Sequence, residues 1–122
     1  MKPIRLFVVD DHALFRRGLV GLLSDMEEFE VVGEAASGEE ALRAAPSAHP
    51  DIVLLDVNMP GLSGVETLRA LREAGQKMSA LMLTISQDES DLVGAIMAGA
   101  SGYLLKNAEP EMLRRTLLDV AE

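Results

Sequence analysis

Short apolar runs alternate with longer amphipathic segments along the 122 residues, and this alternation constrains the fold more than any other feature. Four of the runs are nearly continuous and rich in leucine or β-branched residues, which is typical of strands buried on both faces. The second run is interrupted by Gly33 and Glu34, which favours an edge position. The five expected strands are residues 4–9, 31–36, 52–55, 80–83 and 103–105.

The segments between these runs have the spacing of amphipathic helices. In the first, from Phe15 to Met26, apolar residues recur every three or four positions. Three helix starts match a capping box, a hydroxyl followed three residues later by a carboxylate. The pairs are Ser37 with Glu40, Ser63 with Glu66, and Ser86 with Glu89. Gly75 and Gly99 are expected at left-handed helix ends, and Pro110 in the first turn of the last helix.

Five β-α units of this kind predict an α/β fold in which helices cover both faces of a parallel five-stranded sheet. A length of 122 residues suits one domain, which we expect to span residues 1–122. Flavodoxin and the chemotaxis regulator have this doubly wound (βα)5 arrangement with strand order 2-1-3-4-5. The alternation alone does not decide among strand orders, and we adopt that order as the expectation.

Composition and charge exclude several classes of protein. There is no cysteine, so thiolate metal sites, disulfides and cysteine nucleophiles are excluded. The formal net charge of −9 opposes nucleic-acid binding by these residues, because phosphate binding needs clustered cations. No apolar run approaches the roughly 20 residues of a membrane span, and the start does not resemble a secretory signal. We therefore expect no membrane partner and a cytoplasmic location.

Polar side chains stand at the expected carboxyl ends of four strands. They are Asp10 and Asp11 after the first, Asp56 after the third, Thr84 after the fourth and Lys106 after the fifth. In an open parallel sheet, ligands bind beyond these ends. With order 2-1-3-4-5 the four ends are on neighbouring strands, about 14 Å across at about 4.8 Å per strand. We expect these side chains to form one site.

The residue types in this set suit phosphoryl chemistry. Three carboxylates stay ionised together only if a cation relieves their repulsion. Hard oxygen ligands favour Mg²⁺ or Mn²⁺ over Zn²⁺. A carboxylate can also attack phosphorus, and such a transfer needs positioning and charge neutralisation. Lys106 can supply positive charge there and Thr84 a hydrogen-bond donor.

We expect two histidines and two glycines to have structural rather than chemical roles. His12 and His49 are expected on the surface, because neither has a partner at ligand spacing. Gly61 and Gly64 are expected to be backbone hinges of the loop that follows Asp56.

At these residues the sequence resembles the receiver domain of two-component response regulators, over essentially its whole length. The matching segments are Val-Val-Asp-Asp-His at 8–12, Leu-Leu-Asp-Val-Asn-Met-Pro-Gly at 54–61, Leu-Thr at 83–84 and Gly-Ala-Ser-Gly-Tyr-Leu-Leu-Lys at 99–106. The resemblance implies a phosphorylation-dependent switch that receives its phosphoryl group from a sensor histidine kinase. Such a domain catalyses its own phosphorylation and dephosphorylation and does not turn over a separate substrate.

The resemblance also implies a role for each residue of the predicted site. Asp56 would accept the phosphoryl group and Lys106 would pair with it. Asp11, Asp56 and the backbone carbonyl of Asn58 would ligate Mg²⁺. Asp10 would hold the ion through water.

Further residues would transmit and time the signal. Thr84 would move toward the phosphoryl group and Tyr103 would turn inward, coupling the site to the surface of the fourth helix, fifth strand and fifth helix. Asn58 and Ser86, two residues after Asp56 and Thr84, would influence the lifetime of the phosphoryl group. A homodimer on phosphorylation is the expected assembly.

One departure points to a branch of the family. Many receivers have proline after the lysine, with a cis bond, but here the residue is Asn107. Lys-Asn-Ala-Glu-Pro-Glu at 106–111 and Asp-Asp-His at 10–12 resemble the NarL/FixJ branch, with similarity to nitrate/nitrite regulators at 32–35 and 83–86. Those proteins carry a C-terminal helix-turn-helix, so we expect that a DNA-binding domain is missing after Glu122 and that DNA is bound only through it.

Three alternatives stay open at this point. A stand-alone regulator would share the chemistry and act by protein binding. A flavodoxin-like carrier needs a phosphate cradle after the first strand and aromatic residues for the flavin, whereas the chain has Asp10-Asp11 there and 3% aromatics. A haloacid-dehalogenase-type phosphatase needs Asp-x-Asp after that strand and a cap, which adjacent aspartates do not match.

Overall fold

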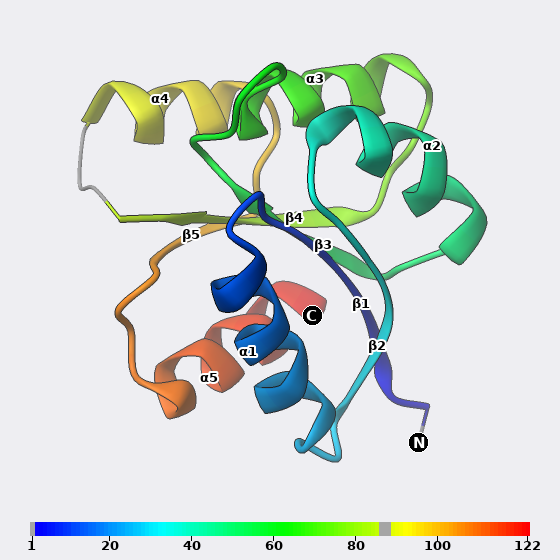
Figure 1. Cartoon of the computed structure of the whole chain (residues 1–122), viewed down its shortest axis with the longest axis vertical. Coiled ribbons are helices and arrows are strands. Elements are labelled where there is room, and N and C mark those ends of the chain that lie inside the picture. The colour runs from blue at the N-terminus through cyan, green and yellow to red at the C-terminus, as the bar shows by residue number, and fades with distance from the viewer. Residues whose placement is uncertain (1, 86–88) are drawn as a thin grey trace.

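Five strands and five helices alternate along the residues that the structure, a computed structural model, describes, namely 2–85 and 89–122 (Figure 1). The strands are β1 (Ile4–Val9), β2 (Phe29–Ala35), β3 (Ile52–Asp56), β4 (Ser79–Thr84) and β5 (Gly102–Leu105). The helices are α1 (Ala13–Ser24), α2 (Gly38–Ala48), α3 (Gly64–Glu73), α4 (Glu89–Met97) and α5 (Pro110–Ala121). This is the alternation that the sequence predicts.

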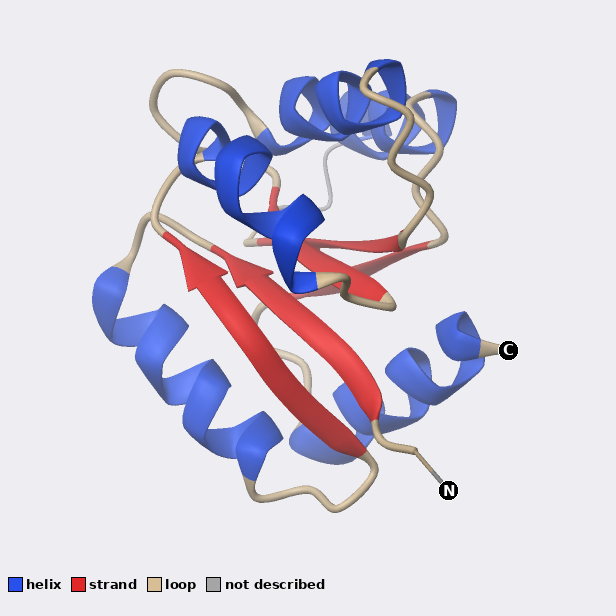
Figure 2. Ribbon diagram, turned by 90° about the vertical axis from the view of Figure 1, so that its right-hand side faces the viewer, coloured by secondary structure: helices blue, strands red, loops and turns tan. Residues whose placement is uncertain are grey.

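The strands form one parallel sheet in the order β2-β1-β3-β4-β5. Helices α1 and α5 cover one face, and α2, α3 and α4 cover the other (Figures 1 and 2). The predicted α/β class, the strand order and the edge position of β2 are therefore confirmed. Because every strand runs in the same direction, the carboxyl ends of all five lie at one edge of the sheet.

Two apolar cores lie on opposite faces of the sheet, because neighbouring side chains of a strand point to opposite sides. In β1, Leu6 and Val8 belong to the core under α1 and α5, whereas Phe7 and Val9 belong to the core under α2, α3 and α4. All five residues of β3 are buried. The central strands are thus fixed from both sides, which holds the residues at their ends in place.

Strand β2 begins at Phe29 and ends at Ala35, so the prediction of 31–36 began two residues late and ended one residue late. Phe29 is buried in the core under α1 and α5 and pairs with Ile4. The interruption at Gly33 has a packing cause, because a Cβ there would lie 2.6 Å from the Phe7 ring. The buried phenyl group fills the space that a side chain would need.

The predicted cap of α3, the place of Pro110 and the left-handed glycines after α3 and α4 are confirmed. Ser63 and Glu66 form a reciprocal capping box at α3, and Pro110 is in the first turn of α5. Gly75 and Gly99 have φ angles of 83° and 99°. The Ser86 capping box lies outside the described residues.

At the start of α2 the predicted capping box is half formed. The Ser37 hydroxyl accepts a hydrogen bond from the Glu40 N–H. The Glu40 carboxylate instead accepts from the Ala36 N–H at 2.9 Å.

None of the described peptide bonds is cis, so the bond between Lys106 and Asn107 is trans. Among the described residues, no helix combines the length and apolar character needed to cross a membrane.

Candidate functional site

The sheet register brings the polar strand ends together. Val9 pairs with Leu55, so the residues that follow each of them, Asp10 and Asp56, lie side by side. On the other side of β3, Asp56 pairs with Leu83. The Lys106 N–H donates to the carbonyl oxygen of Thr84 at 2.7 Å, which brings the lysine to the same edge.

The Lys106 ammonium group lies between two of the carboxylates. Its Nζ is 2.7 Å from Oδ2 of Asp10 and 3.4 Å from Oδ2 of Asp56. Nζ also lies 4.6 Å from the centre of the Phe15 ring, a cation–π distance. The lysine side chain is 8% exposed, so these contacts are shielded from water. The buried positive charge of Lys106 thus lies against the negative charges of Asp10 and Asp56.

The carboxylates have buried oxygen atoms that other groups of the chain do not satisfy. Within the described residues, Oδ2 of Asp10, Oδ1 of Asp11 and Oδ2 of Asp56 accept no hydrogen bond. The ammonium faces two of them as an ion-pair partner, outside hydrogen-bonding geometry. Buried anionic oxygens without donors are costly unless a cation or a donor from a ligand pairs with them. This donor set therefore fits a hard divalent cation.

Electrostatic repulsion and burial act most strongly on Asp56. Burial, and next the charge of Asp10, raise the pKa of the Asp56 carboxyl from its usual 3.8 to about 6. The Lys106 ammonium acts in the opposite direction but does not cancel these effects. The Asn58 N–H also lowers the pKa by donating to Oδ1 of Asp56 at 3.3 Å. A bound cation would reduce the remaining cost of ionising the Asp56 carboxyl.

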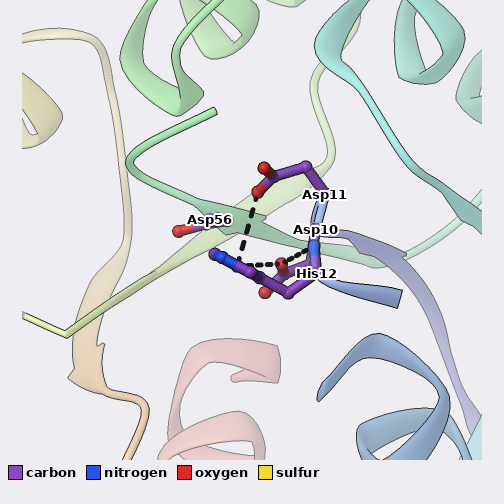
Figure 3. Close-up of side chains that lie close together, drawn as sticks. All are labelled: Asp10, Asp11, His12 and Asp56. Carbon is purple, nitrogen blue, oxygen red and sulfur yellow. Dashed lines mark hydrogen bonds and ion pairs between the residues drawn. The ribbon is translucent and has the colours of Figure 1, made fainter. Parts of the chain in front are cut away.

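Four side chains could hold a metal ion at this edge. Asp10, Asp11, His12 and Asp56 each offer one ligand atom, and these atoms lie within 4.8 Å of one another. Figure 3 shows the His12 imidazole in contact with the carboxylates of Asp10 and Asp11, with Asp56 near the ring. The three predicted acidic residues are thus gathered as expected. The Asn58 carbonyl as a further ligand stays a prediction.

The other predicted residues lie around this cluster. Thr84 is fully buried at the end of β4. Tyr103 is half-buried in β5 and packs against the core under α2, α3 and α4. Ser86, predicted to affect phosphoryl lifetime, lies outside the described residues. The movements predicted for Thr84 and Tyr103 stay predictions.

The loop after Asp56 is shaped by close packing. Gly61 has a φ angle of 75°, in the left-handed region that favours glycine. A Cβ at Gly64 would overlap the carbonyl oxygen of Asp56. The absence of a side chain at that position therefore lets α3 start directly against the end of β3.

Two residues of the site were not found from the sequence. His12 is exposed, as expected, but its Nδ1 lies 3.4 Å from Asp10 Oδ1 and 3.5 Å from Asp11 Oδ1, so the expectation that it has no partner is wrong. Its position directly after two strand-end aspartates is the signal that could have found it. Arg16 donates to the carbonyl oxygen of Asp10 at 2.7 Å and to Glu34 at 2.8 Å. Only the folded arrangement of α1 and β2 brings those groups together.

A family model and similar curated proteins identify the same family for this chain. Residues 6–118 match the family described as the response regulator receiver domain. The chain is 42% identical over 120 residues to the nitrate/nitrite response regulator protein NarL of Escherichia coli strain K12, which covers 98% of this chain and 56% of that protein. It is also 42% identical over 117 residues to the DNA-binding transcriptional activator DevR/DosR of Mycobacterium tuberculosis, covering 96% and 54%. The chain thus spans about half the length of these curated relatives.

A solved structure has the same fold as this chain. The signal receiver domain of a response regulator described as NarL, from Mycobacterium tuberculosis, superposes with a TM-score of 0.93 at 35% sequence identity. The match covers 99% of this chain and 98% of that one. Fold and sequence therefore point to the same group of proteins.

Proposed function

Because this chain belongs to the response regulator receiver domain family, we propose that it is a phosphorylation-dependent switch in which Asp56 accepts a phosphoryl group from a sensor histidine kinase. One observation carries the assignment. Asp56 is a buried carboxylate with an unsatisfied oxygen, and it lies beside two further carboxylates and an ammonium group. This is the combination that phosphoryl transfer to a carboxylate needs.

The proposed reaction uses Asp56 as the nucleophile. A carboxylate oxygen attacks the phosphorus of the phosphohistidine, the P–N bond breaks, and the imidazole of the kinase leaves with the electron pair. An acyl phosphate forms, and attack of water on its phosphorus later releases inorganic phosphate and restores the carboxylate. The chain thus acts on its own side chain in both steps. The environment that raises the Asp56 pKa also leaves the anion poorly solvated before the transfer.

The neighbouring residues neutralise and orient the phosphoryl group. Lys106 lies 3.4 Å from Asp56 and can pair with a phosphoryl oxygen through its ammonium. Thr84, buried on the adjacent strand, can donate from its hydroxyl. Asp11, Asp56 and the Asn58 carbonyl would ligate Mg²⁺ or Mn²⁺, and Asp10 would hold the ion through water. The bound ion would offset negative charge on the phosphoryl oxygens. Asn58 and Ser86 would set the rate at which water removes the group.

The output surface of this switch is formed by α4, β5 and α5. Tyr103 lies in β5 beside this surface, and phosphorylation would favour one of two arrangements of Thr84 and Tyr103. In these helices Ile96 and Met97 of α4 and Met112 of α5 are exposed, at 61%, 77% and 52%. Exposed apolar side chains of this size support a protein-contact surface, and we propose that phosphorylation promotes a homodimer through it.

The relatives suggest what the switch controls. NarL is named for nitrate and nitrite, and DevR/DosR is named a DNA-binding transcriptional activator. We propose that this chain is the receiver of a transcription factor, and that DNA is bound by a helix-turn-helix domain outside these residues. The net charge of −9 is consistent with this division, because it opposes DNA binding by the receiver itself.

The acceptor assignment is tested by replacing Asp56→Asn and treating the protein with a small acyl phosphate and Mg²⁺. Intact-mass measurement should show one added phosphoryl group on the wild type and none on the variant. Asp51→Asn is the matched control, because Asp51 is an exposed aspartate just before the opposite end of β3. Equal labelling of wild type and Asp56→Asn would make the acceptor assignment wrong.

A further inference from the structure

We infer that His12 is a nitrogen ligand of the divalent-cation site, and that it shifts the preference of the site toward transition-metal ions that bind imidazole. The inference rests on the cation site of the proposed function. It adds a donor atom of a different chemical kind to a set that otherwise contains oxygen. A receiver with this histidine would respond to Mn²⁺, Co²⁺ or Ni²⁺ differently from one without it.

The position of the imidazole carries the inference. Nδ1 of His12 lies 3.4 Å from Oδ1 of Asp10 and 3.5 Å from Oδ1 of Asp11. Two neighbouring ligands of an octahedral ion, each about 2.1 Å from the metal, lie about 3 Å apart. Nδ1 of His12 and Oδ1 of Asp11 therefore need to approach by only about half an ångström to become neighbouring ligands of one ion. Figure 3 shows the contacts from the imidazole to both of these carboxylates, with Asp56 near the ring.

The backbone holds the histidine in this place. The His12 N–H donates to Oδ1 of Asp10 at 2.8 Å, so the loop between β1 and α1 folds back over the aspartate. The carbonyl oxygen of His12 accepts from the Arg16 N–H at 2.9 Å, which ties the residue to the first turn of α1. The imidazole side chain is 67% exposed, so its other nitrogen can be hydrated when Nδ1 binds a metal.

The buried oxygens supply a second, independent reason to expect a ligand at this point. Oδ2 of Asp56 accepts no hydrogen bond within the described residues, and Asp56 is only 3% exposed. The single ammonium group in contact with the cluster among the described residues, that of Lys106, lies on the side of Asp10 Oδ2 and Asp56 Oδ2. Asp11 Oδ1 has the imidazole as its neighbour instead. An ion placed between Asp11 and His12 would therefore pair with an oxygen that the lysine does not reach.

The chemical consequence is a change in metal preference. Carboxylates favour Mg²⁺ and Mn²⁺, whereas imidazole favours Ni²⁺, Cu²⁺ and Zn²⁺, and affinities of mixed sites rise from Mn²⁺ through Co²⁺ to Ni²⁺. Loss of the imidazole should therefore weaken Ni²⁺ binding strongly and Mg²⁺ binding little. A histidine that acts only as a positive counter-charge would show no such distinction.

The test uses protein without a polyhistidine tag, because tag histidines would bind the same metal ions. The chain itself contains only two histidines, so each can be replaced in turn. Pulsed electron paramagnetic resonance on the Mn²⁺-loaded protein detects coupling to a bound imidazole nitrogen, and labelling histidine with ¹⁵N identifies it. The variant is His12→Asn, and the matched control is His49→Asn. His49 ends α2 in a left-handed conformation that asparagine tolerates. Affinities for Mg²⁺ and Ni²⁺ are measured by calorimetric titration of all three proteins.

We expect nitrogen coupling in the wild type and in His49→Asn, and none in His12→Asn. Ni²⁺ affinity should fall about tenfold or more in His12→Asn, while Mg²⁺ affinity changes by less than about threefold. Normal metal binding without nitrogen coupling in the wild type would overturn the inference and leave the proposed function standing. An equal loss of Mg²⁺ and Ni²⁺ affinity would overturn it as well. Failure of the wild type to bind any divalent ion would instead contradict the proposed cation site.

Discussion

Replacing Asp56→Asn should make the metal-free protein more stable at neutral pH. The substitution removes one negative charge from a cluster of three carboxylates, of which those of Asp10 and Asp56 are buried. The Lys106 ammonium keeps its ion pair with Asp10 at 2.7 Å, so no positive charge is left alone. The asparagine side-chain oxygen can still accept from the Asn58 N–H, as the carboxylate does. The variant therefore loses repulsion and keeps the main favourable contacts.

The magnitude follows from the pKa of Asp56. A rise from 3.8 to about 6 is a shift of about two units. At about 1.4 kcal/mol per unit, the folded state bears a cost of up to about 3 kcal/mol when Asp56 is ionised. The pKa is raised in the folded state, so the folded protein binds the extra proton. The cost is complete above about pH 6, shrinks as the pH falls through that value, and is gone below the unfolded pKa.

Urea unfolding at several pH values measures this effect. In buffer with a chelator at pH 7.5, the free energy of unfolding of Asp56→Asn should exceed that of the wild type by about 1–3 kcal/mol. Near pH 4 the two proteins should converge. Asp51→Asn controls for the amide substitution, and its difference from the wild type should change little over the same range. A variant that is less stable at pH 7.5, or a difference that is equal at both pH values, would refute the electrostatic reasoning.

Three further predictions concern packing, capping and a surface ion pair. Gly64→Ala should lower the free energy of unfolding by about 1–3 kcal/mol, because its Cβ would overlap the Asp56 carbonyl oxygen, whereas Gly21→Ala in α1 should raise it by about 0.5–1 kcal/mol. Ser63→Ala should cost about 1 kcal/mol through loss of the α3 cap, as urea unfolding would show. A hydrogen bond from the Arg114 guanidinium holds the pKa of the Glu28 carboxyl below its usual range. The stability gained from this pair is therefore present at neutral pH and is lost as the pH falls through the lowered pKa. The variant Arg114→Gln should return the Glu28 pKa toward its usual value, as an NMR titration would show.

The fold was predictable because each of its determinants is local and repeated. Continuous apolar runs mark buried parallel strands, and the alternation with helices then leaves few arrangements. The strand order itself was adopted from known folds of this type, and the structure confirmed it. The start of β2 was missed because pairing sets it: Phe29 joins the strand opposite Ile4, a contact that spacing along the chain does not reveal.

The candidate site was predictable to the level of residues and not of contacts. Strand ends identify which side chains meet, since parallel strands end at one edge. The distances depend on side-chain torsions, which the sequence pattern does not specify. For this reason the closer approach of Lys106 to Asp10 than to Asp56, and the approach of His12 to both neighbouring aspartates, emerged only from the structure.

The energetic size of the Asp56 effect bears on how the proposed switch would work. A cost of about 3 kcal/mol corresponds to a factor of roughly 150 in an equilibrium constant. A cation or a phosphoryl group can shift the conformational population only by the part of its binding energy that differs between the two states. Lys106 is placed to create such a difference, because its ammonium pairs with Asp10 at 2.7 Å while lying 3.4 Å from Asp56. A phosphoryl group on Asp56 would draw the ammonium toward itself, and the movement would free an Asp10 oxygen for a cation. Redistribution of charge among three carboxylates and one lysine would thus couple the chemistry to the conformation of the strand ends.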